Sequence, residues 1–351
     1  MGSNNRISVD ALKEFASSVL HRSGLSKDDS AIAADVIVTA DMRGVSSHGM
    51  VALPGYVTQM RKGGIDPKSN IKVLAENAAV ALVDGCAGMG QVVSYRSMAL
   101  AIEKAKKSGA CVVSVRNSNH LGACAYYSTM CAKENMIGIA TSNAAVLMAP
   151  TGGAGQLIGN NPLSIAMPSG DGHPVVLDMA MSVVAAGKLF NAMKAGKPIP
   201  EGWSLDAAGR PTTNPADLYS GGTLLPVGGY KGYGLALMVE MLAGVLSGAA
   251  LTVDIAYFRG EPERPTGSGH MFIAINIADL MPVDEFGKRA DELISRMKNA
   301  PKSPGVDRIY VPGEMECEAY DYASQHGVAL AEPVINDLRA LGAEAGVAFP
   351  G

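Results

Sequence analysis

The sequence lacks the short motifs that mark the commonest nucleotide-binding and hydrolase folds. Gly-x-Gly-x-x-Gly does not occur, and its nearest approach, Gly88-Met89-Gly90, has Val93 where the third glycine belongs. A Walker loop, His-Glu-x-x-His and Gly-x-Ser-x-Gly are also missing. These absences argue against an ordinary doubly wound Rossmann domain and against a metal hydrolase.

Cysteine, net charge and long apolar runs are equally scarce. The five cysteines are scattered and form no Cys-x-x-Cys pair, which argues against a disulfide framework or a zinc site and predicts reduced thiols. The net charge is −4 without a run of five like charges, so nothing marks a nucleic-acid or anionic membrane surface. The longest apolar stretch, residues 235–251, is interrupted by Glu240 and is too short to span a bilayer. We expect a cytoplasmic protein without a metal, nucleic-acid or membrane partner.

The sequence does contain enough apolar material for sizeable cores. Hydrophobic residues make up 48% of the 351 residues, a length that suits about two domains. Charged residues make up 18%, below the usual ~25%, which suggests that a partner subunit covers part of the surface. Glycine is abundant at 41 residues, which indicates tight turns and close backbone approaches.

Hydrophobic periodicity predicts helical chain ends around a mixed α/β centre. Apolar residues in 12–20 follow the helical spacing i, i+3, i+4, i+7, i+8. Further helices are expected at 27–43, 53–62, 94–108, 123–134, 235–246, 284–297, 315–326 and 333–341. Short apolar runs predict strands at 79–84, 111–115, 137–142, 163–167, 175–177 and 271–275.

Two of the six histidines lie where proton transfer is plausible. His48 follows a helix end and a glycine, and stands beside Ser47, which could orient it or bind substrate. His120 lies in a loop just after a strand, where α/β proteins place ligands. Imidazole has an unperturbed pKa of about 6.5 and exchanges protons near neutrality. On pattern alone, a helix-capping Ser-His pair and a loop histidine bonded to backbone are the simpler interpretations.

A glycine-rich stretch at 228–234 opens a long apolar helix and contains Lys231 and Gly232. The free N–H groups and the dipole of a helix N-terminus suit anions, and a lysine adds a point charge suited to phosphate. A single loop of this kind is weak support, because glycine turns before helices are common.

Taken together, these stretches resemble the malate/L-lactate dehydrogenase family that lacks a Rossmann fold. That family includes ureidoglycolate and sulfolactate dehydrogenases, 2,3-diketogulonate reductase and piperideine-2-carboxylate reductase. The matching motifs follow the family order over nearly the whole chain, at 41–44 (Asp-Met-Arg-Gly), 47–49 (Ser-His-Gly), 53–56 (Leu-Pro-Gly-Tyr), 84–91, 118–122 (Ser-Asn-His-Leu-Gly), 159–163 (Gly-Asn-Asn-Pro-Leu), 177–180 (Leu-Asp-Met-Ala), 231–235 (Lys-Gly-Tyr-Gly-Leu), 272–275 and 312–314.

The resemblance implies both architecture and ligands. It implies a non-Rossmann, mixed-sheet α/β domain over residues 71–283 that holds NAD or NADP. A helical domain would be built from residues 1–70 and completed by residues 284–351. It also implies a small 2-oxo or 2-hydroxy acid substrate and a homodimer with the site near the interface.

The resemblance also implies roles for individual positions. His48 resembles the family's proton donor and acceptor beside Ser47, and His120 a second site histidine that serves as acid/base in some members. Tyr56 occupies a substrate-facing position, and substrate binding is expected from Arg43, Ser47 and His120. Cofactor contacts are expected at His120, Ser142, Asp178, Met179, Ala180, Met181, Ser182, Lys231, Gly232, Pro312, Gly313 and Glu314.

Two positions depart from the family pattern. Many members have arginine at the position of Ala52, where a guanidinium would grip a carboxylate at two points, so a diacid such as malate is less secure as substrate. Arg43 could bind a carboxylate instead, or serve as a structural cation at a helix end. Met181 replaces a threonine near the cofactor, which leaves the choice between NAD and NADP open.

The resulting hypothesis is an NAD(P)-dependent oxidoreductase in which His48 protonates the carbonyl oxygen of a 2-oxo acid. A rival within the family is reduction of a cyclic C=N bond, against which Tyr56 counts because the imine-reducing branch carries histidine there. A rival of another class is a protein that binds a dinucleotide or a small acid without chemistry. Such a protein has no need of the proton donors Ser47-His48 and His120.

Overall fold

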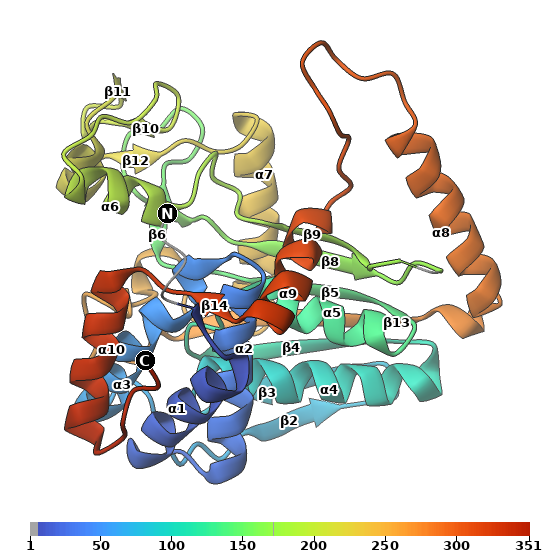
Figure 1. The fold of residues 1–351 in the computed structure, drawn as a ribbon, viewed down its shortest axis with the longest axis horizontal. Helices are drawn as coiled ribbons and strands as arrows, with labels where there is room; N and C mark the ends of the chain where they lie inside the picture. Colours follow the sequence, from blue (N-terminus) through green and yellow to red (C-terminus); the bar gives the residue numbers. More distant parts are fainter. Residues whose placement is uncertain (1–5, 171) are drawn as a thin grey trace.

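A seven-stranded mixed sheet forms the centre of the molecule in the computed structural model, which describes residues 6–170 and 172–351 (Figure 1). Across the sheet the strands are β2 (Lys72–Glu76), β3 (Val80–Asp84), β4 (Ala110–Ser118), β13 (Ser268–Asn276), β5 (Met136–Ser142), β8 (Leu163–Met167) and β9 (Val175–Met179). β3 and β4 run parallel, whereas every other neighbouring pair is antiparallel. The expected non-Rossmann mixed sheet is confirmed.

Several segments that belong to the family-like motifs lie at the same end of the sheet's strands. The strand register places Ser142, at the end of β5, opposite His270 near the start of β13. Leu163, at the start of β8, lies opposite Met179, at the end of β9. The segments that follow β4, β5 and β9 therefore leave the sheet on the same side.

Helices cover the sheet where the apolar periodicity predicts them. α4 (Gly90–Ser108) packs against β4 and β13, and α5 (Cys124–Lys133) against β5 and β8. The helix expected at 235–246 begins earlier, as α7 (Tyr230–Val239), because Gly229 with φ 65° supplies the entry turn. It continues as a π-helix, η4 (Glu240–Val245), that packs against β13. In that wider turn the buried Glu240 carboxylate accepts hydrogen bonds from Asn143, Asn161 and the Thr252 amide.

The two ends of the chain build one helical layer. β1 (Arg6–Ile7) pairs antiparallel with β14 (Val328–Ala329). A single apolar core joins side chains of both ends, among them Leu12, Ile37 and Leu338. Its helices are α1 (Val9–Arg22), α2 (Lys27–Met42), α3 (Leu53–Lys62), α9 (Glu314–His326) and α10 (Glu332–Ala345). The helical domain built from both ends is thus confirmed, while its bounds stay a prediction, and residues 1–5 and 171 lie outside the described residues.

α8 (Val283–Lys298) stands apart from that core, on an arm that projects from the body (Figure 1). The Gly170 amide, in the turn between β8 and β9, donates to its Asp291 carboxylate at 3.0 Å. Since residues 284–351 were expected to complete the helical domain, α8 differs from that expectation in its packing.

The structure also contains a second, five-stranded sheet whose strands were not predicted from the sequence. Its order is β11 (Pro211–Thr212), β10 (Ser204–Leu205), β12 (Thr223–Leu224), β6 (Val146–Met148) and β7 (Ile158–Gly159), and α6 (Ala186–Lys194) lies in the same part of the chain. Short 3-10 turns complete the fold, namely η1 (Ser46–His48), η2 (Met50–Ala52), η3 (Pro215–Ser220), η5 (Thr252–Asp254) and η6 (Ile277–Asp279).

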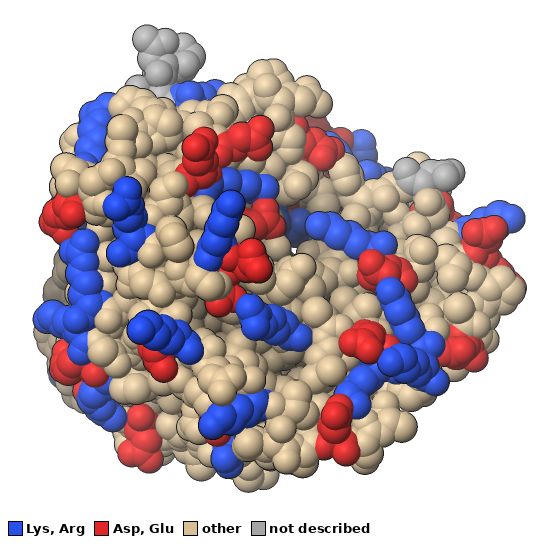
Figure 2. Space-filling model, turned by 90° about the horizontal axis from the view of Figure 1, so that it is seen from below, with Lys and Arg blue, Asp and Glu red and all other residues tan. Residues whose placement is uncertain are grey.

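Charges of both signs are interspersed over the molecular face in Figure 2. Many belong to ion pairs, such as Lys104 with Glu76 at 2.6 Å and Lys106 with Glu134 at 2.7 Å. None of the helices in the described residues combines the length and apolarity that a bilayer span needs. Nor do three or more His, Cys, Asp or Glu side chains of those residues gather in a way that could hold a metal ion.

Candidate active site

The turn that carries Ser47 and His48 is pinned to the end of α2. The Met50 amide donates to the Asp41 carboxylate at 2.6 Å, and a Cβ on Gly49 would lie 2.2 Å from the same oxygen. Only glycine therefore allows the chain to pass this close to Asp41, whose pKa burial raises to about 7. Within the turn, Ser47 Oγ lies 2.9 Å from His48 Nδ1. The family-like motif thus orients the His48 ring through local bonds.

The loop that carries His120 is held just as firmly. Asn119 donates its amide to the carbonyls of Ala87 and Gly88 at 2.8 and 3.0 Å and accepts from the Thr266 amide at 2.8 Å. A Cβ on Gly90 would lie 2.3 Å from the His120 carbonyl, so this glycine lets the start of α4 abut the loop. Helix α4 begins at this glycine, four residues before the expected residue 94.

The structure brings His48, His120 and Tyr56 together from three separate segments. The two imidazole rings stack with centroids 5.5 Å apart and planes inclined by 20°. The Tyr56 hydroxyl lies 2.7 Å from His120 Nδ1. Phe258 stacks on His120 at 4.8 Å and on Tyr56 at 5.6 Å, and so forms one wall of the cluster. No periodicity or motif in the sequence pointed to Phe258.

Both imidazoles are held neutral. Burial, with a smaller contribution from the positive charge of Arg259, lowers the pKa of His48 to about 4 and that of His120 well below its usual value. Burial raises the pKa of Tyr56, so its hydroxyl stays protonated 2.7 Å from Nδ1 of His120. When this hydroxyl donates to Nδ1, the ring proton of His120 resides on Nε2, the nitrogen that can donate to a ligand.

Ser142, at the end of β5, is related to this cluster through His270, whose charge acts on the pKa of His120. Its hydroxyl donates to the Asn143 carbonyl at 2.7 Å and lies 2.9 Å from Nδ1 of His270. His270 is fully buried, its Nε2 has no hydrogen-bond partner within the described residues, and burial lowers its pKa to about 3. The sequence predicted a strand at 271–275, directly after His270, but not the contact between His270 and Ser142.

The expected cofactor residues of 178–182 follow β9 out of the sheet. Asp178 accepts a hydrogen bond from the Ala125 amide at the start of α5, at 3.2 Å, and burial raises its pKa to about 6. Met181 is buried, and Ser182 donates to the Val184 carbonyl at 2.8 Å. Met179 and Ala180 are partly buried between them.

Lys231 and Gly232 open α7, whose first turn has no side-chain cap. A Cβ on Gly229 or Gly234 would meet nothing within 4 Å, so the space beside this turn is open. The backbone N–H groups of a helix N-terminus and the Lys231 ammonium suit a phosphate group.

The expected cofactor residues of 312–314 are tied to β9 and to the arm. The Val176 amide donates to the Pro312 carbonyl at 2.9 Å, and Gly313 packs directly on Val176. Glu314 forms ion pairs with Lys298 and Arg308. Although burial acts to raise it, hydrogen bonds from these cations and from the Val311 amide lower the pKa of Glu314 to about 2. Its carboxylate is therefore engaged within the chain.

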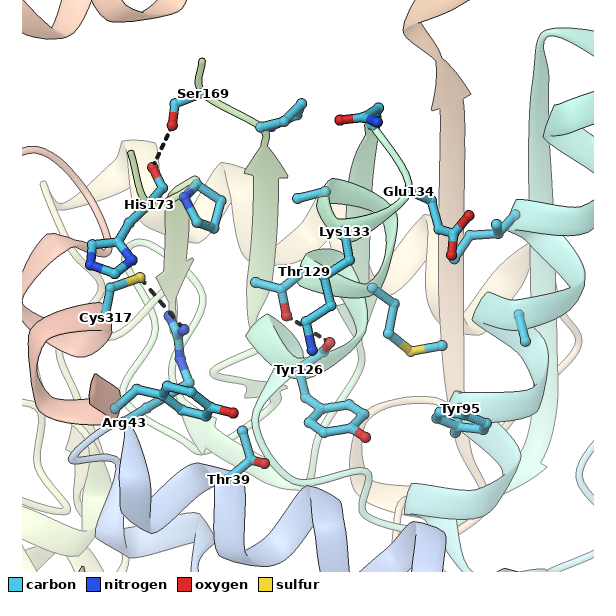
Figure 3. Close-up of a pocket in the computed structure, with 18 of the residues that line it drawn as sticks. Thr39, Arg43, Tyr95, Tyr126, Thr129, Lys133, Glu134, Ser169, His173 and Cys317 are labelled. Carbon is cyan, nitrogen blue, oxygen red and sulfur yellow. Dashed lines mark hydrogen bonds between the residues drawn. The ribbon is translucent and has the colours of Figure 1, made fainter. Parts of the chain in front are cut away.

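Arg43 lines a groove of about 830 Å³ that runs along α5, between α2, α4 and α9 (Figure 3). From the end of α2 its guanidinium points toward Cys317, whose Sγ lies 4.0 Å away. In the described part of the chain it makes no hydrogen bond or ion pair with either imidazole. Neither His48 nor His120 lines this groove.

Comparison with known proteins agrees with the motifs and the fold. The family described as malate/L-lactate dehydrogenase matches residues 7–339. A malate dehydrogenase of Pyrococcus abyssi is 41% identical over 97% of this chain and 95% of its own length. The structure of sulfolactate dehydrogenase from Methanocaldococcus jannaschii superposes with a TM-score of 0.91 and 38% identity over 98% of both chains. That of malate dehydrogenase from Entamoeba histolytica gives a TM-score of 0.94 with 32% identity over 99% of both chains. The chain belongs to the malate/L-lactate dehydrogenase family of oxidoreductases.

Proposed function

We propose that the protein is an NAD(P)-dependent dehydrogenase that acts on a small 2-oxo or 2-hydroxy acid, with His48 as acid/base. The observation that carries this proposal is the stacked pair of neutral imidazoles, each with Nδ1 hydrogen-bonded to a neighbouring hydroxyl, from Ser47 and Tyr56. Such a pair offers one proton acceptor and one hydrogen-bond donor to the same substrate oxygen.

The cofactor would be held where the chain leaves the open edge of the sheet. The uncapped start of α7 with Lys231 fits a dinucleotide pyrophosphate. The segment 178–182 follows the end of β9, and the segment 312–314 packs on Val176 near the start of that strand. Bound NAD or NADP supplies or accepts the hydride. The chain's own part is to hold the ligands in place and to move a proton.

The proton passes through His48 in both directions. Because its pKa is lowered to about 4, His48 is neutral at pH 7 and ready to accept the hydroxyl proton of a 2-hydroxy acid. In the reverse direction the same imidazole returns that proton to the carbonyl oxygen. His120, with its proton on Nε2, donates a hydrogen bond to this oxygen and stabilises its negative charge, while Ser47 orients His48.

Two rivals lead to different observations. Reduction of a cyclic imine acid would also draw a proton from His48, but its nitrogen develops no oxyanion for His120 to stabilise. A protein that only binds a dinucleotide or a small acid has no use for a fixed tautomer at His120. Turnover of the imine alone would favour the first rival, and cofactor binding without any turnover the second.

The test is consumption of NADH and of NADPH by the purified protein against a panel of acids. The panel holds pyruvate, oxaloacetate, longer 2-oxo acids, a diketo sugar acid and a cyclic imine acid. Turnover of a 2-oxo acid supports the proposal and identifies the preferred cofactor. Cofactor binding without turnover of any 2-oxo acid overturns it.

We also propose that a second copy of the chain covers α7 and η4. Their outward side is almost wholly apolar, with exposed fractions of 53% for Met238, 47% for Met241 and 49% for Val245. A continuous apolar surface of this kind is typical of a subunit interface. The double variant Met241→Glu, Val245→Glu should therefore sediment as a monomer. The control Val73→Glu, at an apolar side chain of β2 that is also 49% exposed, should leave the wild-type mass unchanged.

A further inference from the structure

Arg259 is an exposed residue next to Phe258, the aromatic wall of the imidazole site. It follows Phe258, which is buried and stacks on both His120 and Tyr56. The guanidinium carbon of Arg259 lies 5.2 Å from the centroid of the Phe258 ring. The stacked phenyl ring thus fixes where this otherwise irregular segment, between η5 and β13, presents its cation.

The charge of Arg259 reaches the cluster and is not neutralised there. After burial, it contributes to lowering the pKa values of His48 and His120, and it opposes the rise that burial causes in the pKa of Tyr56. Within residues 6–170 and 172–351, no carboxylate pairs with it, and the Phe258 ring is its one recorded partner. Five residues later in the same segment, Arg264 is paired with Glu261 at 2.5 Å.

A 2-oxo acid needs such a cation. Its carboxylate sits next to the carbonyl carbon that receives the hydride, so it must lie close to the imidazoles. The neutral imidazoles carry no charge that could bind this carboxylate. Nor does Ala52, a small buried residue that lies between His48 and Tyr56 in the sequence. A guanidinium can bind a carboxylate through two parallel N–H···O bonds.

We propose that Arg259 binds the substrate carboxylate. This assignment rests on the proposed 2-oxo acid chemistry and specifies how that site recognises its substrate. Arg259 belongs to the loop between η5 and β13, whereas His48 belongs to η1. The residues that bind the substrate carboxylate and that transfer the proton therefore come from separate parts of the chain.

The assignment is tested by binding and by kinetics on the full-length protein. Oxamate, an unreactive analogue of a 2-oxo acid, is titrated by calorimetry in the presence of NADH or NADPH against wild type, Arg259→Gln and Arg259→Lys. We expect Arg259→Gln to weaken oxamate binding about 10- to 100-fold, because a charge-assisted contact is lost. Arg259→Lys should fall between, and the cofactor Kd should not change. The matched control Arg264→Gln should bind oxamate as wild type does.

Kinetics separate recognition from folding defects. In Arg259→Gln, KM for a 2-oxo acid should rise by a similar factor while kcat falls less, and activity toward the uncharged 2-oxo amide should match that of wild type. Removing the cation should also raise the pKa of His48 and shift the acid limb of kcat/KM to higher pH. Equal oxamate affinity in wild type and Arg259→Gln, or none in wild type, overturns the assignment. If oxamate binding depends on Arg259 but no 2-oxo acid is turned over, the result would support carboxylate binding by Arg259 and refute the proposed reaction.

Discussion

The imidazole site and the groove along α5 differ in how their charged groups are satisfied. In the groove, Asp35 pairs with Lys13 at 2.5 Å and accepts from the Tyr126 hydroxyl, and His173 pairs with Asp321 at 3.1 Å. At the imidazole site, by contrast, the described residues give Arg259 no acidic partner, and both rings are neutral. These groups of the groove are paired within the protein, whereas the Arg43 guanidinium has only the Cys317 Sγ at 4.0 Å beside it.

This difference shows which property marks a site of chemistry. Charged groups that already have partners stabilise the fold and offer little to a ligand. What distinguishes the imidazole site is an unpaired cation near two buried imidazoles whose pKa values are lowered, and perturbed pKa values are frequent at functional sites. The volume of a cavity carries no such information.

The largest difference in turnover between the two regions is expected when a histidine of each region is replaced by alanine. His48→Ala should lower turnover about 10²- to 10⁴-fold, the usual contribution of a general acid/base, with cofactor affinity nearly intact. The matched change in the groove, His173→Ala, removes an exposed imidazole and should leave turnover near that of wild type. Steady-state rates and cofactor titration of both variants test the contrast. Wild-type turnover in His48→Ala would refute the acid/base assignment.

Acid should destabilise the site region through His270. Its pKa is about 3 in the folded chain and about 6.5 when unfolded, so between these values the unfolded state binds the extra proton and stability falls as pH falls. Stability from this group is fully present above pH 6.5. The slope of about 1.4 kcal/mol per pH unit gives a loss of about 2 kcal/mol from pH 7.5 to 5.0.

His270→Gln should abolish that part of the loss. Urea unfolding of wild type and variant at both pH values measures it, and comparing the pH dependence removes any constant cost of the substitution. An unchanged pH dependence in His270→Gln would show that burial does not keep this imidazole neutral.

The parts of the fold and site that sequence predicted are those that local chemistry determines. The turn of His48 and the loop of His120 are shaped by neighbours such as Asp41, Gly49 and Asn119, which belong to the same short motifs. Long helices and apolar strands carry enough residues for a period to emerge. Periodicity therefore predicted helical chain ends around a mixed α/β centre, whereas the mixed sheet and the joining of both ends in one helical domain were implied by the family resemblance.

The parts that sequence missed depend on segments far apart in the chain. β13 lies between β4 and β5 although it follows them by more than a hundred residues, and only this insertion sets His270 against Ser142. Phe258 and Arg259 lie in an irregular segment that has no period or motif to reveal them. The strands β10, β11 and β12 have two residues each, too few for alternation to show.

The smallest predicted effect on turnover comes from removing the Tyr56 hydroxyl at the imidazole site, compared with removing the Tyr126 hydroxyl in the groove. Tyr56→Phe removes the donor that fixes the His120 tautomer and leaves Nδ1 without its partner, which should lower turnover about tenfold. Tyr126→Phe removes a hydroxyl that donates to Asp35 at 2.5 Å, and should cost about 1 kcal/mol of unfolding free energy without changing turnover.

Nitrogen-15 chemical shifts of His120 distinguish a tautomer effect from a general loosening. In wild type the shifts should show a proton on Nε2 alone, and in Tyr56→Phe a mixture of both tautomers. Tyr126→Phe should keep the wild-type pattern. If Tyr56→Phe lost turnover while His120 kept a single tautomer, the Tyr56 hydroxyl would act on the substrate directly. The hydrogen bond that now joins Tyr56 to His120 would then be a resting arrangement that substrate replaces.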